Sequence, residues 1–201
     1  IPFYLNEVIE RFQPDIVHSH HPFLMGDSAI RIANKYDIPL VFTHHTMYEQ
    51  YTHYVPMDSP RMQQIAKELA TNYANLCDHV IAPSESVAQI IRDRGVQSPI
   101  SSIPTGVYID DFAEGDGESF RKTMNIAKDA FVVGHLGRLA PEKNLLFLSQ
   151  SVSEWIKHNK DANFLIIGDG PTQEEIKQFF DQPKQAEHLI LAGKQYGQEL
   201  I

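Results

Sequence analysis

The sequence predicts an α/β protein built from two Rossmann-like lobes. Short apolar strand patterns alternate with amphipathic helical patterns along the 201 residues. The strand patterns are continuously apolar rather than alternating, which is typical of parallel strands covered on both faces by helices. A polar, acidic stretch at residues 108–130 separates two sets of strands. Repeated β-α-β units on each side of that stretch indicate two doubly wound parallel sheets.

Four strand patterns fall in the first lobe, which we assign to residues 1–107. They cover residues 15–20, 40–46, 79–84 and 100–106, and helical patterns at 26–36, 59–77 and 84–95 lie between them. Ser59 and Ser84 are suited to cap two of these helices, because a serine hydroxyl accepts a hydrogen bond from a free main-chain amide of the first turn. Gly95 is suited to end the helix that begins near Ser84.

The second lobe, residues 131–201, follows a linker region that we assign to residues 108–130. Its strand patterns cover 131–137, 163–170 and 188–193, and its helical patterns cover 141–158 and 171–180. Both helices are predicted to open on a proline, Pro141 or Pro171, which suits the first helical position. The sequence begins inside a helical pattern without an initiator Met, and both lobes look incomplete. We therefore expect an internal fragment of a longer protein.

Composition narrows the class of protein. The formal net charge of −9 argues against a nucleic-acid-binding protein, which needs a basic surface. No apolar run approaches the roughly 20 residues of a membrane span, and no signal peptide is visible. Cys77 is the single cysteine, so the chain has no internal disulfide, and we expect Cys77 to be a buried structural thiol. These features predict a cytoplasmic protein.

The phrase GRLAPEKN at residues 137–144 has the parts of a diphosphate site. Gly137 allows close approach of a ligand, Arg138 offers a planar set of donors, and Lys143 adds a compact charge. A helix that begins near Pro141 would add free main-chain amides. The glycines of GDGP at 168–171 follow the next strand in the same way. The alternative for both loops is ordinary turn chemistry with solvated cations.

Five histidines follow two strands that we expect to be neighbours: His18, His20, His21, His44 and His45. A metal-dependent hydrolase is therefore an alternative function. No carboxylate accompanies these residues at ligand spacing and HExxH is absent, so we expect no metal. Successive strand residues face opposite sides, so only one of His44 and His45 can face a crevice. A core position is the alternative for His18 and His44.

The motifs, taken in order, resemble a known family. PDIVHSHHP, PLVFTHHTMYEQY, VIAPSE, IPTGV, GHLGRLAPEKN and LIIGDGP are similar to segments of the retaining glycosyltransferases of family 4, which have the GT-B fold. The resemblance covers nearly the whole chain, and GRLAPEKN is its most specific part. Within the family, THHTMYEQYTHYVP looks most like the bacterial enzymes that transfer glucose from UDP-glucose to 1,2-diacylglycerol.

The resemblance implies a hexosyltransferase that uses a UDP-sugar, with UDP-glucose as the expected donor. Arg138 and Lys143 would hold the diphosphate and stabilise the leaving UDP, and His45 would hydrogen-bond the donor sugar. The turn at residues 193–195 would read the uracil ring. The implied donor-binding residues are Gly137, Arg138, Lys143, Gly168, Gly170 and Gln195. No metal or other cofactor is expected, because positive side chains take the place of a metal at the diphosphate.

The resemblance also implies that the first lobe receives a lipid or small-molecule acceptor through Tyr48, Glu49 and His53. Core packing is the alternative for Tyr51 and Tyr54. A lipid acceptor would bring peripheral contact with the inner face of the membrane. The sequence makes no prediction about oligomeric state.

Two family features fall outside the sequence: a glutamate pair in the donor lobe and a glycine-rich loop in the acceptor lobe. We therefore expect this chain alone to be poorly active. A non-catalytic nucleotide-binding fragment is the remaining alternative. A nucleotide-sugar epimerase on the same fold is disfavoured, because GRLAPEKN is a transferase-type motif.

Overall fold

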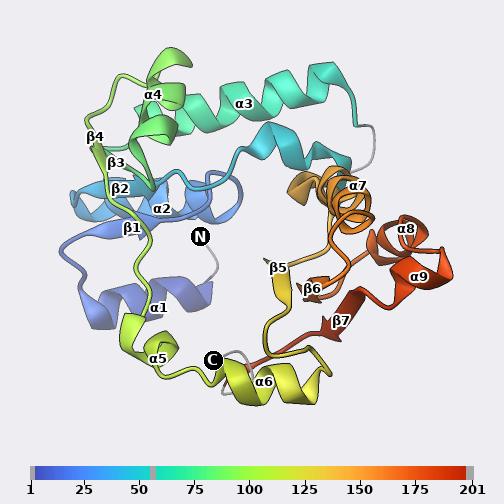
Figure 1. Ribbon diagram of the computed structural model, residues 1–201. Helices are drawn as coiled ribbons and strands as arrows, with labels where there is room; N and C mark the ends of the chain where they lie inside the picture. The colour runs from blue at the N-terminus through green and yellow to red at the C-terminus, as the bar shows by residue number, and fades with distance from the viewer. Residues whose placement is uncertain (1–2, 55–57, 198–201) are drawn as a thin grey trace. The chain divides into compact units, whose positions relative to one another are not determined.

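The computed structural model describes residues 3–54 and 58–197. The outer ends of both predicted lobes, at 1–2 and 198–201, lie outside the described residues, as do residues 55–57, which include the last two residues of the THHTMYEQYTHYVP motif. The chain divides into two compact units, Ile1–Gly106 and Val107–Ile201, and each contains one parallel sheet with helices (Figure 1). The α/β class with parallel sheets is therefore confirmed.

The first unit contains a four-stranded sheet. Its strands are β1 (Val17–Ser19), β2 (Leu40–Thr43), β3 (His79–Ala82) and β4 (Ile100–Ser102), which lie side by side in chain order. Every neighbouring pair is parallel. All four predicted strands are present, and each is shorter than its apolar pattern. The residues that follow them, including the histidines, therefore lie in loops at the carboxyl ends of the strands, where α/β proteins bind ligands.

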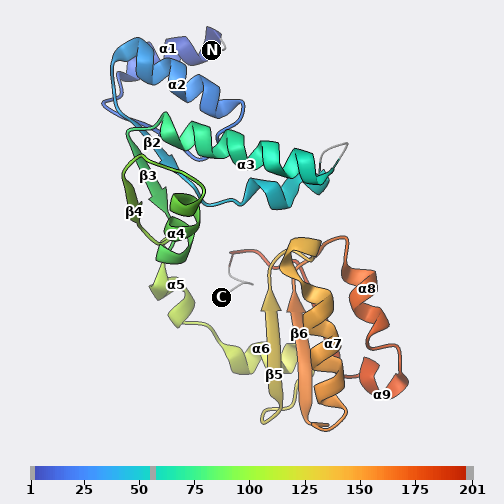
Figure 2. The same cartoon turned by 90° about the horizontal axis from the view of Figure 1, so that it is seen from above.

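The described residues of this unit form five helices: α1 (Phe3–Phe12), α2 (Met25–Tyr36), the 3-10 helix η1 (Tyr48–Tyr54), α3 (Pro60–Asn75) and α4 (Glu85–Asp93). Both predicted serine caps are confirmed: Ser59 accepts a hydrogen bond from the amide of Met62, and Ser84 accepts one from the amide of Val87. Gly95 follows α4 with φ of +96°, a conformation that glycine adopts readily. In Figure 2, α3 runs alongside η1, and these two elements contact each other extensively.

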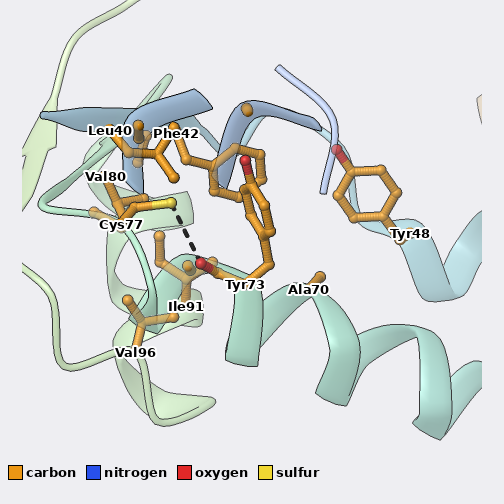
Figure 3. Packing of buried hydrophobic residues seen from close by; sticks show 14 residues of the cluster. Leu40, Phe42, Tyr48, Ala70, Tyr73, Cys77, Val80, Ile91 and Val96 are labelled. Carbon is orange, nitrogen blue, oxygen red and sulfur yellow. Dashed lines mark hydrogen bonds between the residues drawn. The ribbon is translucent and has the colours of Figure 1, made fainter. Parts of the chain in front are cut away.

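The core of the first unit lies between the sheet and the helices α2, α3 and α4. Figure 3 shows Phe42 of β2 facing Tyr73 of α3, with ring centroids 5.0 Å apart. The Tyr73 hydroxyl donates a hydrogen bond to Ser19 at the end of β1. Cys77 is buried beside them, and its thiol donates to the Tyr73 carbonyl. Burial raises the pKa of Cys77 to about 12, so the expected structural thiol is confirmed.

The second unit contains a three-stranded parallel sheet in chain order, β5 (Phe131–Leu136), β6 (Ala162–Ile167) and β7 (Leu189–Gly193). Its helices include α7 (Leu145–Ile156), α8 (Gln173–Gln178) and α9 (Pro183–Ala186). Phe164 and Ile166 of β6 are fully buried in a core that α7 and α8 complete. The three predicted strands are confirmed, and their carboxyl ends again carry the motif residues. No helix among residues 3–54 and 58–197 is long and apolar enough to cross a membrane.

The stretch assigned to a linker contains two short helices, α5 (Ile109–Ala113) and α6 (Gly117–Thr123). Arg121 of α6 donates hydrogen bonds to the carbonyls of Ala127 and Ala130, which ties this helix to the start of β5. Residues 108–130 belong to the second compact unit, Val107–Ile201. The limits of the linker stay a prediction.

The predicted starts of the two helices in the second unit were wrong. Residues Pro141–Lys143 form a separate 3-10 turn, η2, and Asn144 then adopts a left-handed conformation with φ of +50°, so α7 begins only at Leu145. Asparagine tolerates this conformation better than most residues. Pro171 lies outside α8, because the amide of Thr172 bonds to the Leu139 carbonyl and holds the turn away from the helix.

Candidate active site

Three loops meet at the carboxyl ends of β5, β6 and β7. They line an open pocket of about 490 Å³, and most of its lining residues are apolar or glycine. Its lining residues are Leu136, Gly137, Arg138, Ile167, Gly168, Asp169, Gly170, Lys194, Gln195 and Tyr196. The structure thus brings together five of the six predicted donor-binding residues. The sixth, Lys143, does not line the pocket.

Main-chain hydrogen bonds join the first two loops. Leu139 donates to the Asp169 carbonyl at 3.0 Å, and Thr172 donates to the Leu139 carbonyl at 3.2 Å. Gly168 donates to the Gly193 carbonyl at 2.8 Å, which attaches the end of β7. The floor of the pocket is therefore a continuous platform of bonded main chain.

The glycines of GDGP have a packing role in this platform. A β-carbon on Gly168 would lie 1.9 Å from the Gly137 carbonyl oxygen, and one on Gly170 would lie 2.2 Å from the Leu139 carbonyl oxygen. Gly168 also has φ of +145°, a conformation that side chains disfavour. The two glycines let the loops approach each other, which the sequence pattern did not predict.

Two cations lie at the pocket, each beside a carboxylate. Arg138 is half exposed and forms an ion pair with Glu142 of η2, whose side chain is only 6% exposed. Lys194 bonds Asp169 at 3.2 Å, and this contact lowers the pKa of Asp169 and raises that of Lys194. Lys194 and the exposed Tyr196 were missed from the sequence. Their position directly after the last strand was the available signal.

Lys143 lies at the end of η2, and its side chain is exposed. Its charge reaches His135 of β5: burial lowers the pKa of His135, and Lys143 lowers it further. The His135 Nε2 atom is buried without a hydrogen-bond partner, near the backbone of Gly137. Lys143 is therefore close to the end of β5, although it lies outside the pocket lining.

In the first unit, the ends of β1 and β2 place three imidazoles in a row. The ring centroids of His18 and His20 are 4.4 Å apart, and those of His20 and His45 are 5.6 Å apart. His18 is exposed and shares a 2.7 Å hydrogen bond with Thr43, so the core alternative for it was wrong. In the described part of the chain, no group of three or more His, Cys, Asp or Glu residues is arranged to hold a metal ion.

The expected alternation at the end of β2 is confirmed. His45 is exposed, and its Nδ1 lies 3.0 Å from the Thr46 hydroxyl. His44 is 2% exposed, and its Nδ1 has no hydrogen-bond partner. Burial lowers the pKa of His44, and the nearby charge of Arg94 acts in the same direction. His44 is therefore a neutral core residue, whereas His45 is available to a ligand.

The three predicted acceptor residues lie in different environments. Tyr48 is 7% exposed, its hydroxyl donates to the His20 carbonyl, and burial raises its pKa to about 12. The Glu49 carboxylate pairs with Arg94. His53 is exposed, with its ring centroid 4.1 Å from that of Tyr54. Of the three, His53 presents the most accessible surface, and the acceptor role of all three stays a prediction.

Two protein-family descriptions together match most of the chain. Residues 1–111 match Glycosyltransferase Family 4, and residues 116–201 match Glycosyl transferases group 1. The chain belongs to glycosyltransferase family 4. The resemblance inferred from the motifs is confirmed, and so is the transferase class of the family.

Relatives of this family 4 chain include two alpha-monoglucosyldiacylglycerol synthases. The one from Acholeplasma laidlawii is 27% identical over 92% of this chain and 49% of its own length. The one from Streptococcus pneumoniae is 27% identical over 93% of this chain and 44% of its own length. The chain thus spans about half the length, or less, of these relatives.

A solved structure of Anabaena Alr3699/HepE in complex with UDP-glucose has a TM-score of 0.72 to this chain. It is 18% identical, and the match covers 96% of this chain and 52% of that one. This likeness confirms the GT-B fold, with each Rossmann-like lobe represented in part.

Proposed function

We propose that the full-length protein is a retaining glycosyltransferase that transfers glucose from UDP-glucose to the hydroxyl group of a diacylglycerol. The observation that carries the proposal is the pocket at the ends of β5, β6 and β7, where Arg138 and Lys194 lie beside a glycine-rich floor. Membership of family 4 and the names of the two relatives support the reaction class and the acceptor.

Side chains have to supply most of the diphosphate recognition. The amides of Gly137, Leu139 and Gly168 already donate to the carbonyls of Ile167, Asp169 and Gly193, so they are not open to a phosphate. Arg138 can donate two parallel hydrogen bonds to phosphate oxygens, and Lys194 provides a point charge. We expect the diphosphate to compete with Glu142 and Asp169 for these two cations. Lys143 contributes at longer range.

In the proposed reaction the bond between the anomeric carbon and the UDP oxygen breaks, and the acceptor oxygen forms a new bond to that carbon on the same face. The departing diphosphate takes the electron pair of the broken bond, and one of its oxygens accepts the proton that the acceptor hydroxyl releases. Cations at the departing diphosphate stabilise the negative charge that develops on it, which lowers the barrier. We assign His45 a hydrogen bond to the donor sugar, because its ring is exposed at the end of β2.

The apolar lining and Tyr196 suit the nucleoside end of the donor. Tyr196 is exposed at the pocket, and aromatic rings stack well on nucleobases. Gln195 lies beside it, and its side chain bonds the Ala192 carbonyl, so its main chain is the part left to read the uracil.

A diacylglycerol acceptor implies that the protein works at a membrane surface. We propose peripheral contact at the cytoplasmic face, and a reaction that needs no metal. The exposed rings of His53 and Tyr54 on η1 are the acceptor-side residues best placed to meet a lipid headgroup.

The test uses the full-length natural protein, radiolabelled UDP-glucose and diacylglycerol micelles in excess EDTA. We expect labelled glucosyl-diacylglycerol, and we expect Arg138→Met to abolish most of it while Lys177→Met, on the exposed side of α8, does not. Free labelled glucose without labelled lipid would redirect the search to another acceptor. UDP binding without turnover would favour the non-catalytic alternative, and release of free glucose that required added metal would favour the hydrolase.

A further inference from the structure

The Glu49–Arg94 ion pair joins two elements that are far apart in the sequence. Arg94 is the C-terminal cap of α4, and Glu49 is the second residue of η1. The Arg94 Nη2 atom lies 2.5 Å from Glu49 Oε1, and Nη1 lies 3.4 Å from Oε2, so the contact is bidentate. A bidentate arginine-carboxylate pair fixes the direction of both side chains as well as their separation.

The pair is shielded from water. The side chains of Arg94 and Glu49 are 15% and 17% exposed. On the same helix, the Arg92–Glu85 pair leaves its side chains 39% and 70% exposed. An exposed pair contributes little to stability, whereas removing one partner of a shielded pair leaves a charge that water cannot compensate.

The surroundings of the pair make the removal of one partner more destabilising. His44 is buried next to it and is held neutral by burial, with the charge of Arg94 as a further cause. Loss of Glu49 would leave the Arg94 guanidinium beside an imidazole that cannot balance its charge. The loop would then have to move to admit water or a counterion.

The loop in question carries the proposed substrate-facing residues. His45 and Thr46 lie just before η1, and His53 lies within it. Tyr48 anchors the start of η1 through its hydroxyl bond to the His20 carbonyl, and Thr52 anchors the middle through its 2.7 Å bond to Asp58. Glu49 adds the connection to α4, which neither of the other contacts supplies.

We propose that Glu49 and Arg94 are positioning residues, which hold η1 so that His45 and the exposed face of η1 meet the substrates. Glu49 is then not a contact to the acceptor hydroxyl. The expected effect on kcat/KM rests on the proposed function. The expected loosening of η1 rests on the described contacts alone. The two substitutions that break the pair should have the same effect, because each releases the same loop.

The experiment compares Glu49→Gln, Arg94→Met and the charge-swapped double variant Glu49→Arg/Arg94→Glu in the full-length protein. Arg92→Met on α4 is the matched control, since it removes an exposed pair from the same helix. The readouts are kcat, KM for each substrate, and the hydrogen exchange of main-chain amides in η1. Circular dichroism confirms that each variant is folded at the assay temperature.

We expect both single variants to lower kcat/KM for the acceptor by roughly tenfold to a hundredfold, the range that small misplacements of reacting groups produce. The amides of η1 should exchange faster in both, UDP should bind as in the wild type, and the swapped variant should recover part of the loss. Arg92→Met should change none of these values.

The proposal is overturned if Glu49→Gln lowers acceptor kcat/KM while Arg94→Met does not, because Glu49 would then contact the substrate itself. It is also overturned if both variants only lower the melting temperature, with kinetics and exchange of η1 unchanged. If the wild-type protein transfers no sugar, the proposed function fails, yet the exchange of η1 in the variants still decides whether the pair holds the loop.

Discussion

Gly168 lies against the carbonyl oxygen of Gly137, and a β-carbon on Gly168 would come within 1.9 Å of that oxygen. Real β-carbons do not approach an oxygen so closely, so the two loops can meet only if residue 168 has no side chain. This contact sets the distance between the loop that carries Arg138 and the loop after β6. The geometry of the proposed donor pocket therefore depends on it.

Substitution of this glycine should separate the loops. We expect Gly168→Ala to lower the free energy of unfolding by about 3 kcal/mol, since it combines overpacking with a disfavoured φ. UDP affinity should fall as well, because Arg138 moves with its loop. Chemical denaturation and calorimetric titration with UDP measure the two effects.

Gly134→Ala on β5 is the matched control, because nothing lies within 4 Å of its added β-carbon. Equal stability and UDP affinity of the Gly168 and Gly134 variants would show that the loops tolerate a side chain at their contact.

Acid should destabilise the protein through His44. Burial holds the folded-state pKa of His44 below its usual value. Above about pH 7.5, one unit over the ordinary pKa of histidine, the side chain is neutral in both states and stability is unaffected. As pH falls below that value, the unfolded state binds a proton that the buried side chain in the folded state does not bind. The free energy of unfolding therefore falls by at most about 1.4 kcal/mol per pH unit for this proton.

We expect His44→Phe to make this loss on acidification shallower, measured by denaturation between pH 7 and pH 5. His18 and His135 also have lowered pKa values, so part of the loss will remain. His158→Gln, at an exposed position just after α7, is the control. A His44→Phe variant with the same pH dependence as the wild type would contradict the assignment of His44 as a neutral core residue.

Cys77 should resist modification. Its side chain is buried in the core of the first unit, and burial raises its pKa to about 12, so almost no reactive thiolate exists at pH 8. We expect iodoacetamide to label Cys77 only when denaturant unfolds the protein, as followed by mass spectrometry of its peptide. A Cys77→Ala/Ser151→Cys variant, with the thiol on the exposed surface of α7, should be labelled at once. Rapid labelling of native Cys77 would contradict the packing shown in Figure 3.

The proposed transfer should not depend on a metal. Arg138 and Lys194 provide positive charge at the proposed diphosphate position, and Lys143 adds charge from outside the pocket lining. We expect the rate of transfer in excess EDTA to stay within about twofold of the untreated rate, since electrostatic stabilisation by fixed cations needs no added ion. Loss of activity in EDTA that Mg²⁺ or Zn²⁺ restores would contradict this expectation.

The sequence predicted the strands well because their apolar runs are short, continuous and bounded by glycine, proline or polar residues. It also predicted the caps at Ser59 and Ser84, which depend on local chemistry alone. The starts of α7 and α8 were mistaken, because Pro141 and Pro171 are good first-turn residues in isolation. The left-handed Asn144 and the bond from Thr172 to Leu139 are outcomes of tertiary packing that no local pattern records.

The candidate site could also be predicted in part, because several of its residues directly follow the predicted strands. Gly137, Arg138 and Gln195 follow the ends of strands, so strand position alone places them at one edge of the sheet. The pairing of Glu49 with Arg94 spans 45 residues of sequence, and nothing in either segment indicates it. Long-range ion pairs of this kind require the fold before they can be recognised.

UDP binding to the pocket at the ends of β5, β6 and β7 is the most direct test of the proposed donor site. Isothermal titration of the full-length protein with UDP in excess EDTA should show one site. Arg138→Met should weaken that site by roughly 10- to 100-fold, the value of a charged hydrogen bond, and Lys177→Met should leave it unchanged. If Arg138→Met bound UDP as tightly as the wild type, the assignment of this pocket to the donor diphosphate would be wrong.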